Sequence, residues 1–162
     1  MSDNKIIGFI IMITILVFIG GFAFTSKLSS PKNSQELVTS DNVEPVVTET
    51  ADDWGEIGLN DGNVEKVFSI SNKGSETLKL TEVTTSCMCT TAQLSTNSKI
   101  SPIFGMHSES DYVMEVLPGE TAELRVIFDP AFHGPTGVGP INRQVRISTN
   151  DSSKPVLNFM LT

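Results

Sequence analysis

The stretch "AELRVIF", residues 122–128, decides the fold class, because apolar residues alternate along it with polar or charged ones. Leu124, Val126 and Phe128 fall on one face of an extended chain. Arg125 falls on the other face. A period of two residues is typical of a strand with one buried and one exposed face. Because the turn formers of "LPGE" precede it, the stretch predicts a strand of a β-sheet protein.

The same alternation recurs along the chain after residue 62. In two of these stretches the apolar face carries Phe68 with Ile70, and Leu78 with Leu80. The residues between them, 72–76, are turn formers and predict a hairpin that joins two neighbouring strands. The stretches are "NVEKVFSIS" (63–71), "TLKLTEV" (77–83), "NRQVRIST" (142–149) and "PVLNFML" (155–161).

Two weaker segments complete the pattern, namely "WGEIGL" from Trp54 and a short strand at residues 91–94. Together the segments make about seven strands in about 110 residues, which is the size and spacing of an immunoglobulin-like sandwich. No stretch after residue 50 has the period of a helix of useful length. The sequence therefore predicts an all-β, immunoglobulin-like β-sandwich.

Five segments carry a resemblance in their order: "WGEIGL", "FSISNKGSETLKL", "SCMCTT", "LPGETAELRVIFDP" and "RISTND". They resemble the bacterial family DUF1573, an immunoglobulin-like group related to the ASH (Hydin-like) domains. The resemblance spans residues 54–161 and implies an exported β-sandwich module without assigned chemistry or catalytic residues. The chain departs from the family pattern at Met88, where the family usually has glycine. It also departs in two longer segments, which contain His107 and His133.

The amino-terminal segment predicts a membrane anchor. Residues 6–24, "IIGFIIMITILVFIGGFAF", contain no charge, and as a helix they would nearly span the roughly 30 Å hydrocarbon layer. We expect a stub at residues 1–5 and a transmembrane anchor at 6–25 that contacts the lipid bilayer. A cleaved signal peptide is the alternative, but "FAFTSK" matches a cleavage site poorly.

The orientation of this anchor follows from chain length. Lys5 precedes it while Lys27 and Lys32 follow it, so the positive-inside count is close to a tie. Because almost the whole chain follows the anchor, we expect a single-pass cell-membrane protein with a cytoplasmic stub and an exported carboxyl-terminal domain. Residues 26–50 are rich in Ser, Thr, Asn and Pro, which predicts a flexible linker before a domain at 51–162.

The charge balance limits the partners. The net charge is −8, and no cluster of Lys and Arg is present to neutralise phosphates. We therefore expect no nucleic-acid partner, while a protein partner of unknown identity stays open. The chain contains no G-x-S-x-G, H-E-x-x-H or P-loop motif, so an enzyme is not expected.

The stretch "TTSCMCTTAQL", residues 84–94, holds the two cysteines of the chain, Cys87 and Cys89. In an extended segment they would point to the same side with Cα atoms roughly 6.5 Å apart, so both sulfurs could face one ion. Thiolates and thioethers select soft metals, above all Cu(I), and imidazole completes such sites. The candidate ligands are Cys87, Cys89, His107 and Met106, with His133 or Met88 as a further ligand.

Roles other than copper binding stay open for the two cysteines. Zinc fits less well than copper, because a structural zinc site needs four Cys or His ligands. The thiols could pack in the core, or close a strained disulfide that is easily reduced, or form a redox-active pair. The predicted function is a membrane-anchored, exported module that binds copper. The alternative is a non-catalytic protein-interaction or scaffold domain.

Overall fold

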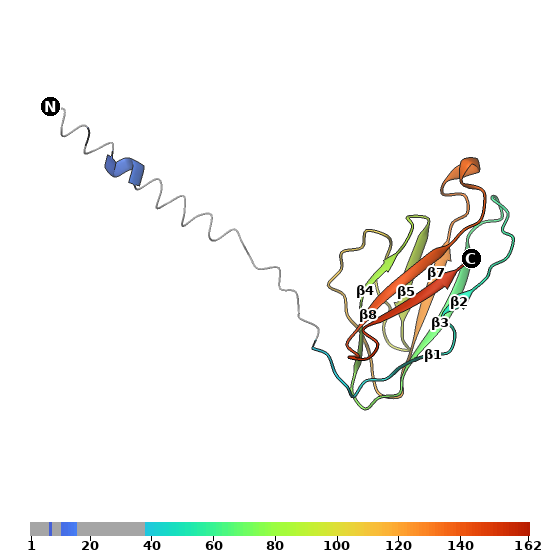
Figure 1. Ribbon diagram of the computed structural model, residues 1–162, viewed down its shortest axis with the longest axis horizontal. Coiled ribbons are helices and arrows are strands. Elements are labelled where there is room, and N and C mark those ends of the chain that lie inside the picture. The colour runs from blue at the N-terminus through green and yellow to red at the C-terminus, as the bar shows by residue number, and fades with distance from the viewer. Residues whose placement is uncertain (1–6, 8–10, 16–37) are drawn as a thin grey trace. The chain divides into compact units, whose positions relative to one another are not determined.

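The computed structural model describes Ile7, residues 11–15 and residues 38–162 (Figure 1). The chain divides into two units, residues 1–35 and 36–162. In the first unit Ile7 and residues 11–15 are helical. Over the described residues, no helix has both the length and the apolar character needed to cross a membrane. The predicted stub 1–5 and most of the predicted anchor 6–25 lie outside the described residues, so both stay predictions.

The second unit is built of strands, which confirms the all-β prediction. Its described residues contain nine strands in two sheets and one short 3-10 helix, η1. The strands are β1 (Pro45–Val47), β2 (Ala51–Asp52), β3 (Val64–Asn72), β4 (Leu78–Thr85), β5 (Thr90–Ser95), β6 (Met114–Val116), β7 (Thr121–Phe128), β8 (Arg143–Thr149) and β9 (Val156–Leu161); η1 is Gly134–Gly137.

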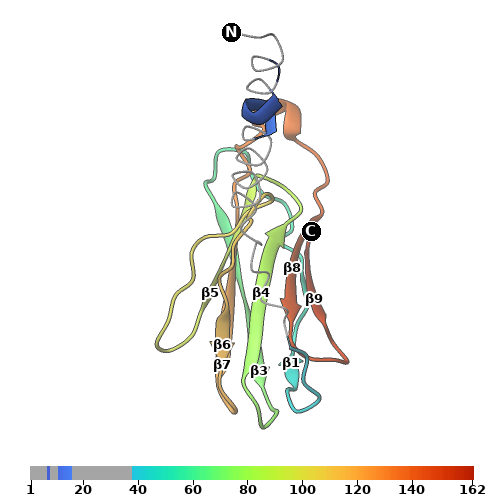
Figure 2. The same cartoon turned by 90° about the vertical axis from the view of Figure 1, so that its left-hand side faces the viewer.

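The two sheets pack face to face. One has the strand order β1-β3-β7-β5 and the other β2-β9-β8-β4-β6. Figure 2 shows β4, β8 and β9 of the second sheet side by side. The apolar residues of the alternating stretches fill the space between the sheets, as their period predicts. At the centre, the ring of Phe68 on β3 lies 4.9 Å from that of Phe159 on β9, centroid to centroid.

The predicted hairpin at residues 72–76 is wrong. β3 and β4 lie in different sheets, so residues 72–76 form an arch between the sheets. The side chain of Asn72, which is fully buried, donates to the carbonyl oxygens of Glu76 (2.7 Å) and Val116 (3.0 Å). These bonds hold the arch and leave β3 to pair with β1 and β7 instead of β4.

The linker predicted at residues 26–50 is too long at its carboxyl end. Pro45–Val47 forms β1, which pairs antiparallel with β3, and Val43 is buried in the core. Ser40 also forms an isolated parallel β-bridge with Asp151. The folded part of the chain therefore begins before residue 51, because a short apolar segment needs only an existing sheet edge to bury its side chains.

The strand predicted at "WGEIGL" is also misplaced. Ala51–Asp52 forms β2, parallel to β9, whereas residues 54–59 form no strand. Trp54 stacks on Phe128 with ring centroids 5.7 Å apart and an angle of 16° between the planes. The segment is held by this aromatic contact and by a hydrogen bond from Trp54 N to the Thr162 carbonyl oxygen.

Candidate functional site

The cysteines lie in the turn that joins β4 to β5. Thr90 N donates to the Cys87 carbonyl oxygen at 3.1 Å, and Thr85 Oγ1 lies 3.0 Å from the same oxygen. The Cα atoms of Cys87 and Cys89 are 5.2 Å apart, closer than in an extended segment. The expectation that both lie on one strand face is therefore wrong, because the chain reverses between them.

A disulfide joins the two sulfurs. Both cysteines of the sequence are therefore bonded. Cys89 is buried, with 3% of its surface exposed, whereas Cys87 is partly exposed. The two sulfurs of the bond therefore differ in their access to solvent and to a reagent.

The buried sulfur contacts an arginine. Arg143, the first residue of β8, donates from Nε to Cys89 Sγ at 3.1 Å. Its Nη1 donates to the Asn142 carbonyl oxygen at 3.0 Å, and its guanidinium carbon lies 5.3 Å from the centroid of the Phe128 ring. A guanidinium charge held on an aromatic face in this way stays beside the sulfur and stabilises negative charge that develops on it.

The exposed sulfur contacts a histidine. Cys87 Sγ lies 3.5 Å from His133 Nε2, within hydrogen-bond distance for sulfur. His133 precedes η1 in the loop between β7 and β8, and the ring of Phe132 packs edge-on against it with centroids 5.0 Å apart. The two sulfurs therefore have different polar neighbours from different strands or loops.

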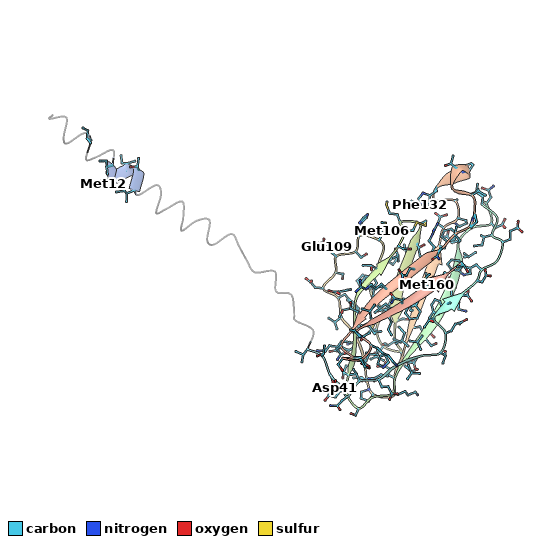
Figure 3. The ribbon with its side chains drawn as sticks, viewed as in Figure 1. Met12, Asp41, Met106, Glu109, Phe132 and Met160 are labelled. Carbon is cyan, nitrogen blue, oxygen red and sulfur yellow. A yellow bond between two sulfur atoms is a disulfide. The ribbon has the colours of Figure 1, made fainter. Side chains whose placement is uncertain are left out.

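These groups meet at one end of the sandwich. Asp129 N, after the end of β7, donates to the Cys89 carbonyl oxygen at 2.9 Å, and Gln144 N donates to Ser86 Oγ at the same distance. Figure 1 shows η1 at the end of the domain opposite the entry of the described chain at residue 38. Met106 and Phe132 both lie toward this end, away from Asp41 (Figure 3).

The structure brings together three of the candidate ligands and leaves the others apart. Among the described residues, the ligand atoms of Cys87, Cys89 and His133 lie within 4.8 Å of one another, and His107 is not in that group. His107 and Met106 are exposed in a turn after β5. The carbonyl oxygen of the preceding residue, Gly105, accepts a hydrogen bond from Thr85 N at 3.4 Å, so this turn lies beside the end of β4.

Arg143 has no feature in the sequence that marks it as part of this site. It lies 54 residues after Cys89, and its stretch "NRQVRIST" indicates only a strand with exposed polar residues. The placement of β8 next to β4 brings its first residue beside the cysteine turn. The strand order would be needed to predict this contact.

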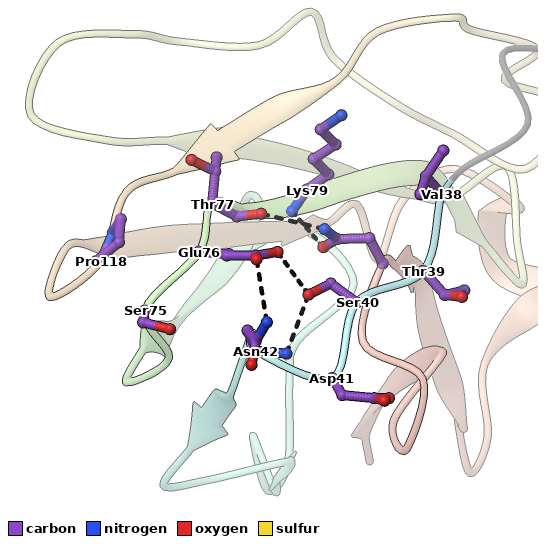
Figure 4. A pocket seen from close by; sticks show the side chains of 11 residues that line it. Val38, Thr39, Ser40, Asp41, Asn42, Ser75, Glu76, Thr77, Lys79 and Pro118 are labelled. Atoms are coloured by element: carbon purple, nitrogen blue, oxygen red, sulfur yellow. Dashed lines mark hydrogen bonds between the residues drawn. The ribbon is translucent and has the colours of Figure 1, made fainter.

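A hollow lies at the opposite end of the sandwich. It has a volume of about 690 Å³ and lies between residues 38–42 and the arch after β3 (Figure 4). Ser40 Oγ and Asn42 Nδ2 donate to the Glu76 carboxylate at 2.7 and 3.1 Å, and these hydrogen bonds lower the pKa of Glu76. The polar groups of Ser40, Asn42 and Glu76 therefore bond to one another. These bonds hold residues 40–42 against the arch after β3.

The cysteine turn lies inside the segment that a family model matches. The model of DUF1573, a family described as of unknown function, matches residues 46–102. The resemblance to DUF1573 is confirmed. The matched DUF1573 segment runs from β1 past the end of β5, and so it contains both cysteines but neither Arg143 nor His133. No curated protein sequence matches the chain.

One solved structure agrees with the fold. A protein of unknown function from Porphyromonas gingivalis W83 is 22% identical with a TM-score of 0.57, over 80% of this chain. The chain spans half the length of that protein. The ASH/PapD-like domain 7 of human CEP192 is 13% identical with a TM-score of 0.45, over 75% of this chain and 83% of that domain chain. The first likeness supports the sandwich fold alone.

Proposed function

We propose that this protein is a membrane-anchored, exported β-sandwich module that binds one Cu(I) ion when its cysteine pair is reduced. The observation that carries the proposal is the group of three soft or borderline ligands, Cys87, Cys89 and His133, whose ligand atoms lie within 4.8 Å of one another. Reduction of the disulfide would free two thiolates beside an imidazole. Two thiolates and one imidazole make a three-coordinate set that favours Cu(I).

The number of ligands favours copper over zinc. A structural zinc site takes four ligands, and the described residues supply no fourth Cys, His, Asp or Glu in this group. Charge also favours Cu(I), because one monovalent ion with two thiolates leaves a net charge of −1. Arg143, 3.1 Å from Cys89 Sγ, would neutralise that charge.

The exported location is part of the same proposal. It is supported by the uncharged run at residues 6–24 and by the disulfide, since disulfides persist in oxidising compartments and are rare in the cytoplasm. A reporter enzyme that folds only outside the cytoplasm, fused after Thr162, should be active. Activity of only a cytoplasm-dependent reporter at the same position would contradict the export.

The alternative of a scaffold that pairs through sheet edges has less support. The outer strands β1, β2 and β6 have three residues or fewer. The outer edge of β5 is bridged by Phe104 and Ile100 of the following loop. Short or covered edges are the usual means by which sheets avoid pairing with another chain.

Copper titration tests the proposal directly. The full-length chain in mild detergent, reduced with a phosphine under nitrogen, should take about one Cu(I) per chain from a coloured competing chelator. Replacing Cys87 or Cys89 by Ser should abolish this uptake, because a hard oxygen replaces a soft sulfur. His133→Ala should weaken it, and His107→Ala is the matched control that should not. Equal effects of the two histidine variants would show that the group around His133 is not the site.

A further inference from the structure

We infer that the Cys87–Cys89 disulfide is a thiol–disulfide exchange centre whose reductant is a protein dithiol that docks on an uncharged rim. This activity is distinct from copper binding and needs no metal. It rests on three observations: the two sulfurs differ in exposure, each has its own polar neighbour, and the two chain segments that carry Cys87, Cys89 and His133 contain no charged residue. Each observation bears on a different part of the exchange reaction.

The difference in exposure selects the sulfur that is attacked. Cys87 is partly exposed, while Cys89 is buried beneath the turn. An incoming thiolate therefore reaches Cys87 Sγ, where a new disulfide forms between the partner and Cys87. The bond between Cys87 and Cys89 breaks, and Cys89 leaves as a thiolate. Exchange of this kind is faster when the leaving thiolate is more stable.

Arg143 and His133 are placed to assist the two halves of the reaction. Arg143 Nε already donates to Cys89 Sγ at 3.1 Å, so its positive charge stabilises the leaving thiolate. The second thiol of the partner then attacks the mixed disulfide at the sulfur of the partner. Cys87 leaves as a thiolate and takes a proton at the position faced by His133 Nε2, 3.5 Å away. The partner dithiol loses two electrons and becomes a disulfide, and the cysteine pair gains them.

The surface around Cys87 indicates the class of partner. Residues 83–98 and residues 130–142 contain no Asp, Glu, Lys or Arg, although the chain as a whole carries a net charge of −8. We call these two segments the uncharged rim. Within it Met88 is 57% exposed and Phe132 is 45% exposed. Exposed Met and Phe beside a reactive group suit the apolar surface of a protein partner.

A small charged thiol fits this rim less well. Glutathione carries two carboxylates, and the rim itself offers no cation to bind them. Arg143, the nearest cation, already uses Nε and Nη1 on Cys89 Sγ and the Asn142 carbonyl oxygen. The proposed reductant is therefore a protein that carries a dithiol within an apolar surface.

The experiment measures reduction of the oxidised full-length chain in mild detergent, with a chelator present to exclude metal. Reduced thioredoxin is the protein dithiol, and dithiothreitol and glutathione at equal concentration are the small thiols. Alkylation followed by mass measurement counts the thiols released with time. We expect thioredoxin to reduce the parent at least about tenfold faster than either small thiol. Equal rates for all three would overturn the docking inference.

Two variants separate docking from leaving-group stabilisation. Met88→Ala, which removes a side chain that is 57% exposed, should slow reduction by thioredoxin by about threefold or more and leave reduction by dithiothreitol unchanged, because only the protein partner packs on the rim. Arg143→Gln should slow reduction by thioredoxin and by dithiothreitol by about threefold or more. In the reduced chain it should also shift the appearance of thiolate absorbance to higher pH. Arg146→Gln, at an exposed position of the same strand, is the matched control. It should change neither the reduction rates nor the pH dependence of the thiolate absorbance.

The outcomes distinguish this inference from copper binding. A parent disulfide that none of the three thiols reduces, or an Arg143→Gln variant that behaves as Arg146→Gln does, would overturn the exchange centre. Copper uptake by phosphine-reduced protein would be unaffected by that result. Fast exchange with no copper uptake would instead leave the exchange centre standing and remove the proposed metal site.

Discussion

Asn72 in one sheet and Val116 in the other are joined by a hydrogen bond of 3.0 Å from Asn72 Nδ2 to the Val116 carbonyl oxygen. The same amide group also donates to the Glu76 carbonyl oxygen, and Oδ1 accepts from Gly74 N at 3.0 Å. Asn72 is fully buried. One side chain thus connects the end of β3, the arch that follows it and the end of β6.

Replacing this side chain should destabilise the domain. Asn72→Ala leaves buried carbonyl and amide groups without these partners, and each such group costs about 1–3 kcal/mol. We expect the free energy of unfolding to fall by about 3 kcal/mol in total. Urea unfolding followed by circular dichroism measures it. Asn97→Ala, at an exposed position in the loop after β5, is the control and should change stability by less than about 0.5 kcal/mol.

The arch also shows which part of the fold the sequence can predict. The alternation identifies Phe68, Ile70, Leu78 and Leu80 as inward-facing, and all four are buried. The stretch "NKGSE" predicts that the chain reverses after β3 but not which strands pair. Strand pairing depends on contacts between residues far apart in the sequence, such as that between Asn72 and Val116, 44 residues apart. No local pattern carries information on such a distant partner.

Gly74, in the arch, packs closely against the backbone of residues 42–43. A Cβ at this position would lie 2.3 Å from the Asn42 carbonyl oxygen and 2.6 Å from Val43 Cα. Gly74→Ala should therefore push residues 42–43 away, expose the buried Val43 and cost about 1–3 kcal/mol. Gly105→Ala is the control, because a Cβ there has no neighbour within 4 Å. The melting temperature of Gly74→Ala should be clearly lower than that of Gly105→Ala. Equal melting temperatures would contradict this packing.

A truncation test follows from the same contacts. A fragment of residues 38–162 should be more stable than a fragment of residues 51–162, because the shorter one loses β1 and the burial of Val43. The difference should be at least about 2 kcal/mol, the scale for burying one large aliphatic side chain. Chemical unfolding of both fragments measures it. Identical unfolding curves would mean that the domain begins at residue 51 after all.

The misplaced boundary has a compositional cause. Residues 26–50 contain no aromatic residue and few apolar ones, so they cannot form a core by themselves. Val43 and Val47 instead add to a core that the rest of the chain supplies, and β1 pairs with β3. Composition measured over a window predicts whether a segment folds alone. It does not predict whether the segment docks on a neighbouring sheet.

Asp151 should make stability depend on acid pH. Burial opposes ionisation of its carboxyl, but hydrogen bonds from Ser153 and Lys154 outweigh burial and lower its pKa below the ordinary value of 3.8. A lowered folded-state pKa stabilises the folded state fully above the unfolded pKa. That stabilisation is lost as the pH falls through the folded-state pKa.

The free energy of unfolding should therefore decline as the pH falls below about 4, and the decline should be shallower in Asp151→Asn. Denaturant unfolding at a series of acid pH values measures both slopes. Asp111→Asn, at an exposed position, should keep the slope of the parent. If the free energy of unfolding of Asp151→Asn declined with the same slope as that of the parent, other carboxylates would be the cause of the acid response.

The candidate site was predictable in part. Cys87 and Cys89 are two positions apart, so their side chains share one side of an extended segment, and the pair could be found from sequence. Their position in a turn could not, because "SCMCTT" continues a strand-like stretch. His133 and Arg143 reach the turn from the loop and strand that follow β7. Their arrival depends on strand order, which the alternation does not specify.

The disulfide should contribute little to the stability of the fold. A disulfide stabilises mainly by restricting the unfolded chain, and its effect grows with the length of the loop that it closes. Cys87 and Cys89 are separated by only two positions, so the loop entropy relation gives about 1.6 kcal/mol, against roughly 4.7 kcal/mol for a loop of 100 residues.

Reduction of the bond should therefore lower the free energy of unfolding by no more than about 2 kcal/mol, and the reduced domain should stay folded. Urea unfolding of the oxidised chain and of the chain kept reduced by a phosphine provides the comparison. The Cys87→Ala/Cys89→Ala variant, measured with and without phosphine, controls for effects of the reductant. A loss of the fold on reduction would mean that the bond is a structural staple. A small loss would leave its chemistry, in exchange or in metal binding after reduction, as the better reason for two cysteines in this turn.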